Sequence, residues 1–175
     1  MSGLPGSGTT TASKLLSAKT GMGLLSSGEI FRRMAQEKGM SLEDFSGLAE
    51  ENKDIDKKLD QRMVERAEKG MILEGRLTGH LLNRSEKEAY KVWLKAPVDV
   101  RINRIANREE IEGIDELKKR VVKREKSERK RYQEYYDIDL TDISIYDIVI
   151  DSEKNSPEDI VRKIIEGAQD EICQG

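Results

Sequence analysis

A glycine-rich loop at the start of the sequence limits what this chain can fold into more than any other feature. Residues 3–10, GLPGSGTT, match the phosphate-binding loop pattern G-x-x-x-x-G-K-[ST], except that Thr9 stands where lysine is expected. Such a loop turns successive backbone N–H groups towards phosphate oxygens at a helix N-terminus, and Thr10 lies at the position whose hydroxyl binds Mg²⁺. On the loop alone, a plain Gly/Ser/Thr-rich terminus is an equally good interpretation.

The segment before the loop is short. A phosphate-binding loop normally leaves the end of a buried strand, which has about five residues, but only Met1 and Ser2 precede Gly3. We therefore expect either a late chain start or a sheet that lacks the strand that should hold the loop.

The remaining sequence alternates short apolar strands with amphipathic helices. Strands are expected at residues 24–26, 71–74, 89–94 and 147–150. One helix is expected to follow the loop and to end near Lys19, and three others to cover residues 28–38, 98–108 and 115–136. Two more are expected to begin at Ser41 and Ser156, and a further helix to contain Ile55 to Ala67. This order predicts an α/β fold in which a parallel β-sheet is flanked by helices, with residues 1–175 as one domain.

Composition excludes several classes of protein. The mean hydropathy is −0.69, and no apolar run approaches the roughly 20 residues that a membrane-spanning helix needs. Residues 1–8 lack the basic start and the apolar stretch of a secretory signal. The single cysteine, Cys173, has no partner for an internal disulfide. We expect a cytoplasmic protein without membrane contacts.

The net charge of −3 conceals an uneven distribution. From Lys118 to Arg131 there are nine basic and two acidic residues, giving +7, so the rest of the chain carries −10. Such a basic run points to a polyanionic partner, either a nucleic acid or a small phosphorylated molecule. Nucleic-acid-binding modules are usually basic overall or rich in stacking aromatic residues, whereas this chain is acidic and 5% aromatic. We therefore favour the small molecule and expect no nucleic-acid partner.

A phosphate site without the loop lysine needs arginines from elsewhere, because charge on a transferred phosphoryl group must be matched by cations. The candidates are Arg32, Arg76, Arg104, Arg108, Arg124, Arg129 and Arg131. Arg76 is the strongest, since it follows the strand end at Glu74, and the carboxyl ends of strands in such sheets face the ligand crevice. Glu74 itself is either a water-mediated Mg²⁺ ligand or an ion-pair partner.

Together these segments resemble the archaeal-type cytidylate kinases, a branch of the nucleoside monophosphate kinases. The resemblance covers nearly the whole chain and is carried by GLPGSGTTT (3–11), SSGEIFRRMA (26–35), EGRLTG (74–79), VWLKAPVDVRINRIANRE (92–109) and, most specifically, REKSERKRY with YDIDLTDISIYDIVID (124–151). The loop of that branch also reads TT instead of KT, so Thr9 agrees with the closer family.

The resemblance implies a P-loop nucleoside monophosphate kinase fold with two insertions, a monophosphate-binding segment over about 27–70 and a lid over about 108–132. It also implies phosphoryl transfer from MgATP to CMP or dCMP. The alternatives are a kinase for another acceptor, UMP or AMP, and a kinase-like scaffold that binds nucleotide without turnover. We expect a monomer.

Individual residues receive roles from the same resemblance. ATP would be bound by Arg104 and by the loop residues Gly3, Leu4, Pro5, Gly6, Ser7, Gly8, Thr9, Thr10 and Thr11. The monophosphate would be bound by Ser27, Arg32 and Arg76, with Asp60, Gln61 and Glu125 as candidates for reading cytosine, whose N4 donates a hydrogen bond. The catalytic residues would be Arg76, Arg108, Arg124 and Arg129, and Mg²⁺ would be bound at Thr10 and Glu74.

Overall fold

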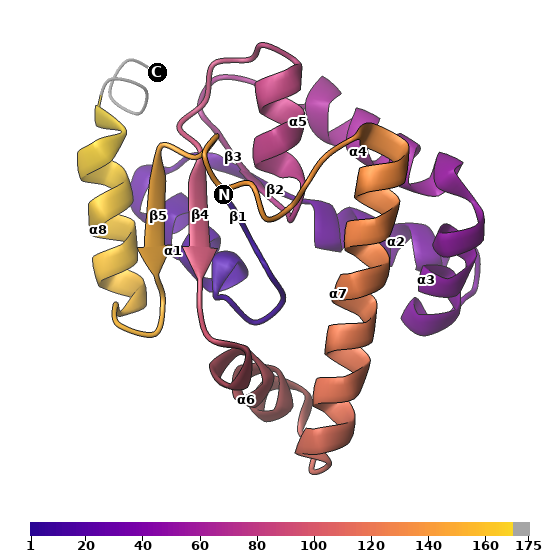
Figure 1. Ribbon diagram of the computed structural model, residues 1–175. Coiled ribbons are helices and arrows are strands. Elements are labelled where there is room, and N and C mark those ends of the chain that lie inside the picture. The colour runs from indigo at the N-terminus through magenta and orange to yellow at the C-terminus, as the bar shows by residue number, and fades with distance from the viewer. Residues whose placement is uncertain (170–175) are drawn as a thin grey trace.

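The computed structural model describes residues 1–169, with every side chain in that range except those of residues 42 and 43. Its strands and helices alternate along the chain (Figure 1). The strands are β1 (Ser2–Gly3), β2 (Gly23–Ser26), β3 (Met71–Glu74), β4 (Val92–Lys95) and β5 (Ile148–Asp151). The helices are α1 (Thr9–Thr20), α2 (Ser27–Glu37), α3 (Leu42–Glu51), α4 (Lys53–Glu65), α5 (Thr78–Arg84), α6 (Val98–Glu109), α7 (Ile114–Tyr136) and α8 (Pro157–Gly167). Of these elements, only β1 and α5 were not expected from the sequence.

All the strand pairs are parallel. β1, β4 and β5 pair in that order, and β2 pairs with β3. Met1 joins the two groups, because its amino group donates a 2.7 Å hydrogen bond to the Leu73 carbonyl, and its own carbonyl accepts one of 3.2 Å from the Gly75 N–H. β1 therefore lies between β3 and β4, and the chain crosses from one side of β1 to the other after β3. Ligands of such sheets bind at the carboxyl ends of the strands beside this crossing point.

The structure corrects the expectation that the sheet lacks a strand before the loop. β1 is present, although it has only two residues, Ser2 and Gly3, which pair with Trp93 and Leu94 of β4. The Ser2 hydroxyl also accepts a 3.1 Å hydrogen bond from the backbone N–H of Gly79. These contacts hold the first residue of the glycine-rich loop in the sheet.

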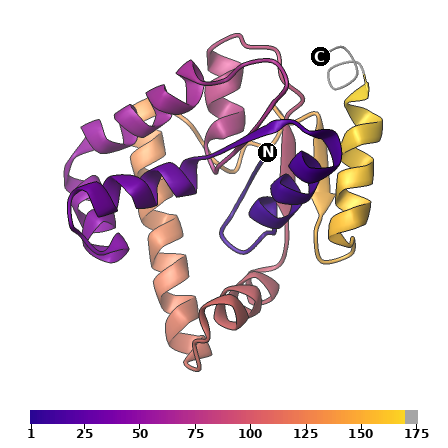
Figure 2. The same cartoon turned by 180° about the vertical axis from the view of Figure 1, so that it is seen from behind.

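The largest hydrophobic core lies between the sheet and two helices, α1 and α8, which lie on the same face of the sheet and contact each other (Figure 2). It consists of Ala12, Leu16, Ile72, Val92, Leu94, Ile150, Ile160, Val161 and Ile164. On β4, Trp93 points the other way and packs on Tyr146, with ring centroids 5.2 Å apart, and His80 of α5 meets Tyr146 edge-on. The sheet is thus covered on both faces, which leaves its strand ends for binding.

Serine caps fix where two of the predicted helices begin. The Ser41 side chain accepts a hydrogen bond from the N–H of Asp44 at the start of α3, and Ser156 accepts one from Asp159 at the start of α8. Both starts were expected from the sequence and are confirmed. The apolar residues of α8 form one stripe, in which Ile160, Val161, Ile164 and Ala168 are buried and Ile165 is half-buried. Ile172, expected on the same face, lies outside the described residues.

Helices α2, α3 and α4 pack around a small core of their own, formed by Ala35, Phe45, Ala49 and Ile55. Both views show α7 running from α6 to this group (Figures 1 and 2). Ser127 of α7 donates a 2.7 Å hydrogen bond to Glu50 of α3. Even α7, with 23 residues, is too polar to cross a membrane, and no helix among residues 1–169 is both long and apolar enough to do so.

Candidate active site

A cleft of about 270 Å³ opens at the carboxyl ends of β1, β2 and β3. Its walls come from the glycine-rich loop, from helices α2 to α4, from the residues after β3, and from α7. The predicted site residues that line it are Gly3, Leu4, Pro5, Gly6, Thr9, Thr10, Ser27, Arg32, Asp60, Glu74, Arg76, Arg108 and Arg124. One cleft therefore brings together residues from each of the predicted groups.

The glycine-rich loop turns tightly at the cleft. Gly6 and Gly8 have φ angles of 80° and 94°, in the left-handed region that favours glycine. A Cβ at Gly6 would also lie 2.5 Å from the carbonyl oxygen of Arg101, because α6 packs directly against the loop. Helix α1 begins immediately afterwards at Thr9. Its first backbone N–H groups and its dipole therefore favour an anion at this end of the cleft.

Glu74, the last residue of β3, accepts hydrogen bonds from three hydroxyl groups beside the loop. Its Oε1 accepts from Thr9 at 2.8 Å and from Thr10 at 3.4 Å, and its Oε2 accepts from Ser26 at 2.6 Å. Glu74 and Thr9 are both buried. In this arrangement the Thr9 hydroxyl is therefore not a donor to phosphate in place of the missing lysine. It donates to a carboxylate instead.

Thr10 and Glu74 have the donor chemistry of a magnesium site. Mg²⁺ prefers oxygen ligands and is usually bound through one or two carboxylates, with waters and substrate phosphates completing its shell. Thr10 is exposed, and its hydroxyl lies beside a Glu74 oxygen next to the loop. Among the described side chains, no group of three or more His, Cys, Asp or Glu residues gathers to hold a metal ion. A metal bound here would therefore depend on a ligand such as phosphate for further coordination.

Arginines approach the cleft from several elements. Arg76 forms an ion pair with Glu128 of α7, and the other oxygen of Glu128 accepts a 3.0 Å hydrogen bond from Arg124. Burial, together with the neighbouring positive charge of Arg124, lowers the pKa of Arg76 to about 10, and the guanidinium stays charged at neutral pH. Arg32 and Arg108 line the same cleft as exposed side chains. With Arg131 of α7, five of the seven candidate arginines thus line one cleft.

Of the predicted site residues, seven do not line this cleft, namely Ser7, Gly8, Thr11, Gln61, Arg104, Glu125 and Arg129. Three of them are exposed. Gln61 is exposed on α4 and donates a hydrogen bond to Glu65 of the same helix. Arg129 is exposed on α7, and Thr11 is exposed on the first turn of α1. None of the three is among the residues that line the cleft. Their roles in binding or catalysis stay predictions.

Two arginines of α6 hold the glycine-rich loop from outside the cleft. Arg104 donates to the carbonyl of Gly6 at 3.4 Å and to the backbone and hydroxyl oxygens of Ser152, which follows β5, at 2.7 and 2.9 Å. Arg101 donates to the carbonyl of Pro5 at 3.0 Å. The loop is therefore positioned by α6 as well as by β1. The predicted contact of Arg104 with ATP stays a prediction.

Glu125 has a partner that the sequence analysis missed. Its carboxylate forms an ion pair of 2.5 Å with Arg101, and the two side chains are only 10% and 5% exposed. Glu125 does not line the cleft itself, although its chain neighbour Arg124 does, and its ion pair links α7 to α6. A signal for Arg101 was present, because it lies three residues after Val98 and four before Ile105, on the apolar face of α6.

We expect the substitution Glu125→Gln to lower the free energy of unfolding by about 2 kcal/mol, because it leaves the buried Arg101 charge without a carboxylate. Urea denaturation would measure this. The control is Glu134→Gln on the same helix, whose partner Lys130 is exposed, and which should change stability by less than about 0.5 kcal/mol. Unchanged stability together with a changed acceptor preference would instead favour a role for Glu125 in reading the base.

Two carboxylates on consecutive turns of α4 face α7. Asp56 lies 3.1 Å from Nε of Arg131, and Asp60 accepts a 2.6 Å hydrogen bond from the Tyr136 hydroxyl. Burial raises the pKa of Asp60 to about 7; the Tyr136 hydrogen bond opposes this shift, and the charge of Asp56 adds to it. Burial also raises the pKa of Asp56, with Arg131 opposing. Asp60 is thus a nearly buried acid that titrates around neutral pH.

The raised pKa makes a prediction about stability. A carboxyl whose pKa is higher in the folded than in the unfolded chain stabilises the fold below its unfolded pKa of 3.8, and this contribution is lost as the pH rises through about 7. Asp60→Asn does not titrate, so its unfolding free energy relative to the wild type should increase between pH 5 and pH 8. Urea denaturation at several pH values measures this, and a difference that does not vary with pH would contradict it.

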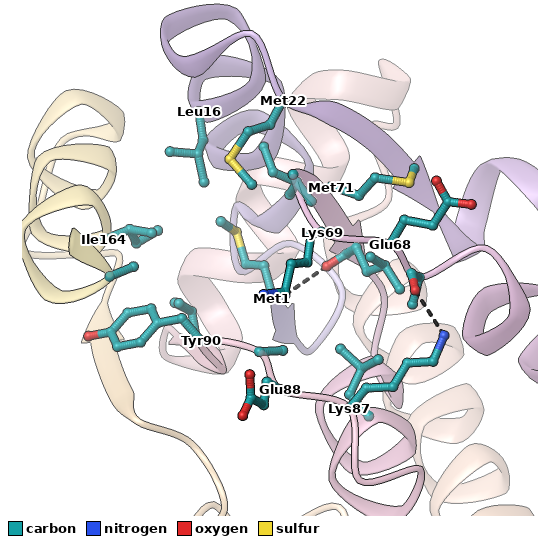
Figure 3. Close-up of a pocket in the computed structure, with 18 residues that line it drawn as sticks. Met1, Leu16, Met22, Glu68, Lys69, Met71, Lys87, Glu88, Tyr90 and Ile164 are labelled. Atoms are coloured by element: carbon teal, nitrogen blue, oxygen red, sulfur yellow. Dashed lines mark hydrogen bonds between the residues drawn. The ribbon is translucent and has the colours of Figure 1, made fainter. Parts of the chain in front are cut away.

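A second cavity, of about 390 Å³, lies at the opposite edge of the sheet, where β3 and β4 begin (Figure 3). Met1, Met22 and Met71 point into it, together with Leu16 and other apolar side chains. No arginine is among the described residues that line it. Its lining includes Lys69 and Lys87, and the Lys87 ammonium donates to the backbone carbonyls of Val64 and Ala67. Because this cavity lies at the amino ends of the strands, away from the glycine-rich loop, we assign the active site to the first cleft.

The chain is similar to known proteins over most of its length. The model of the cytidylate kinase-like family matches residues 1–154. Cytidylate kinase of Methanosarcina mazei is 52% identical over 156 residues, which are 88% of this chain and 86% of that protein. Cytidylate kinase of Methanococcus maripaludis strain C7 is 48% identical over 169 residues, which are 94% of each chain.

Solved structures resemble the fold at much lower sequence identity. Shikimate kinase from Acinetobacter baumannii, in complex with shikimate, superposes with a TM-score of 0.60 at 15% identity, over 96% of this chain and 90% of that one. At this identity the likeness concerns the fold alone. It confirms the predicted α/β fold with a parallel sheet between helices.

Proposed function

The chain belongs to the cytidylate kinase-like family, and from this we propose that it transfers the γ-phosphoryl group of ATP to CMP or dCMP, forming ADP and CDP or dCDP. One structural observation supports the proposal. The cleft places the phosphate loop, the Thr10–Glu74 pair and Arg76 around the same space. These are the groups that a phosphoryl donor, its metal ion and an anionic acceptor require.

The acceptor is itself a phosphate, which is already ionised at neutral pH, so the protein has little need of a general base. Its contribution is positioning, charge matching and exclusion of water. In this proposal the loop N–H groups bind the ATP phosphates and Arg76 binds the acceptor phosphate. Arg76 would exchange its ion pair with Glu128 for a bidentate contact with phosphate, and Arg124 remains available to Glu128.

The missing loop lysine is replaced, in this proposal, by arginines from other elements. Arg76, Arg108 and Arg124 reach the cleft from the end of β3, from α6 and from α7. Thr10 and Glu74 would hold Mg²⁺, which, when bound with ATP, neutralises phosphate charge. The buried Thr9 hydroxyl supports this site by fixing one oxygen of Glu74.

Two segments bound the acceptor end of the cleft. Helices α2 to α4 fall within the predicted monophosphate-binding segment, 27–70, and supply Arg32 among other residues. The predicted lid, 108–132, includes much of α7 and supplies Arg124. We propose that closure of this lid over both nucleotides excludes water from the reaction.

A coupled ADP-release assay with CMP, dCMP, UMP and AMP as acceptors tests the proposed function. ADP should form with CMP or dCMP, and more slowly with UMP and AMP. Release that is fastest with UMP or AMP would assign the enzyme to another acceptor. No ADP with any of the four would favour a nucleotide-binding scaffold without turnover.

Basic residues of α7 support a small phosphorylated ligand rather than a nucleic acid. Arg124 and Arg131 both line the cleft, and they pair with Glu128 and Asp56 there. Salt-sensitive binding of an oligonucleotide would contradict this assignment. The expected cytoplasmic location and monomeric state stay predictions.

A further inference from the structure

The cleft has a second end, away from the phosphate loop, between α4 and α7. Leu59 and Met63 contribute apolar surface there, and Asp60 contributes a carboxylate. Along α7, the Arg76 partner Glu128 and the Asp60 partner Tyr136 are eight residues apart, about 12 Å at 1.5 Å per residue. A nucleotide whose phosphate is bound by Arg76 therefore has room to place its base near Asp60.

Asp60 has one occupied and one free carboxylate oxygen. Tyr136 donates its 2.6 Å hydrogen bond to Oδ2 and so fixes the orientation of the carboxylate. No group in the described part of the chain donates a hydrogen bond to Oδ1, although Asp60 is only 8% exposed. Oδ1 is therefore a free acceptor on a residue that lines the cleft, and a ligand bound there can supply its donor.

Building on the proposed function, we propose that Asp60 selects cytosine, with its Oδ1 accepting a hydrogen bond from the exocyclic N4 amino group of bound CMP. Uracil carries a carbonyl oxygen, O4, where cytosine carries N4. Two oxygens without a proton between them would then face each other, which disfavours UMP. Tyr136 is a positioning residue, because it contacts Asp60 and not the base. Asp56 lines the cleft as well, but its charge is paired with the nearly buried guanidinium of Arg131, whereas Asp60 has only the neutral Tyr136 hydroxyl as its partner.

Titration of Asp60 makes this selection depend on pH. Its pKa of about 7 results from burial, with Tyr136 and Arg131 of α7 lowering it and Asp56 of α4 raising it, and the Tyr132 side chain faces the same carboxyl group. An N4 donor requires the ionised carboxylate, whereas O4 of uracil requires the protonated one. The preference for CMP over UMP should therefore rise with pH. Both nucleotides carry the same phosphate, so titration of the phosphate cancels in their ratio.

Steady-state kinetics with CMP and UMP at saturating MgATP test this role. For the wild type, the ratio of kcat/KM for CMP to that for UMP should rise about tenfold or more from pH 6 to pH 8, since a group with a pKa near 7 changes its ionised fraction by about that factor. Asp60→Asn should lower the ratio about tenfold at pH 8. It should also remove the pH dependence, because an amide can present either a donor or an acceptor.

Two further variants separate base reading from general damage. Asp54→Asn, an exposed position on the first turn of α4, is the matched control and should leave the ratio and its pH dependence unchanged. Tyr136→Phe should raise KM for CMP with little change in kcat. If the wild type phosphorylates CMP, but Asp60→Asn has the same CMP-to-UMP ratio of kcat/KM and the same pH profile as the wild type, the role of Asp60 is overturned. The proposed function is then left intact. A wild type that forms no CDP would overturn both.

The same role can be tested without any substitution. The monophosphate of the 2-pyrimidinone nucleoside has a hydrogen atom in place of the N4 amino group of CMP. With the wild-type enzyme its KM should exceed that of CMP by about tenfold, the loss expected for one hydrogen bond to a charged group. Equal KM values for the two nucleotides would overturn the proposal even if the Asp60→Asn variant failed to fold.

Discussion

Replacing Arg76 by alanine is expected to lower kcat/KM for CMP by about 100- to 1,000-fold, the range found when a preorganised donor to a developing charge is removed. Arg76 lies just after β3 and lines the cleft near Glu74. Its guanidinium forms an ion pair with Oε2 of Glu128. Steady-state kinetics with varied CMP at saturating MgATP measure the effect, and circular dichroism checks the fold.

Two variants serve as controls for Arg76. Arg76→Lys keeps the positive charge but loses the planar fork that binds phosphate bidentately, so it should recover only part of the activity. Arg33→Ala removes an exposed arginine of α2 that does not line the cleft, and it should leave kcat/KM unchanged. A kcat/KM for Arg76→Ala within twofold of the wild type would remove Arg76 from the site.

Replacing Glu74 by glutamine is expected to lower kcat about 100-fold and to raise the Mg²⁺ concentration needed for half-maximal activity. The substitution removes a buried negative charge that accepts hydrogen bonds from Thr9, Thr10 and Ser26. Activity measured against free Mg²⁺ at fixed ATP reports both effects.

Glu88→Gln is the matched control for Glu74, because Glu88 is exposed beside the second cavity at the other edge of the sheet. It should leave the Mg²⁺ dependence unchanged. If Glu74→Gln shows the same kcat and the same Mg²⁺ dependence as the wild type, the carboxylate supports only the fold of the loop and the metal site must lie elsewhere.

The location of the site could be predicted from the sequence because chain topology determines it. In a parallel sheet the carboxyl ends of the strands share one edge, so a loop after β1 and polar residues after β3 must meet there. Gly3 to Thr10, Glu74 and Arg76 follow this rule and line the cleft together. The resemblance of the sequence segments to cytidylate kinases agrees with the family that the chain belongs to.

Contacts between α6 and α7 could not be predicted from the topology of the sheet. Glu125 and Arg101 are 24 residues apart, and they meet only because the two helices cross beside the loop. Local patterns of charge describe one helix at a time and do not say which neighbour a side chain will meet. The sequence therefore leaves Glu125 as a candidate for reading cytosine, whereas the structure buries it against Arg101.

Short elements were the other feature that the sequence did not reveal. β1 has two residues and α5 has seven, so neither is long enough for a periodic pattern of apolar side chains. β1 is held by its pairing with β4 and by the hydrogen bonds of Met1 to β3, which are contacts of the folded sheet. Of the two alternatives expected from the short segment before the loop, the sheet without a strand was wrong for this reason.

The central claim is that this cleft transfers a phosphoryl group between two nucleotides. The most direct test is to incubate the protein with MgATP and CMP and to quantify all four nucleotides by chromatography. The proposed function predicts that CDP and ADP appear in equal amounts while ATP and CMP disappear at the same rate. ADP without CDP would show hydrolysis of ATP and no transfer, and the absence of both products would contradict the assignment as a kinase.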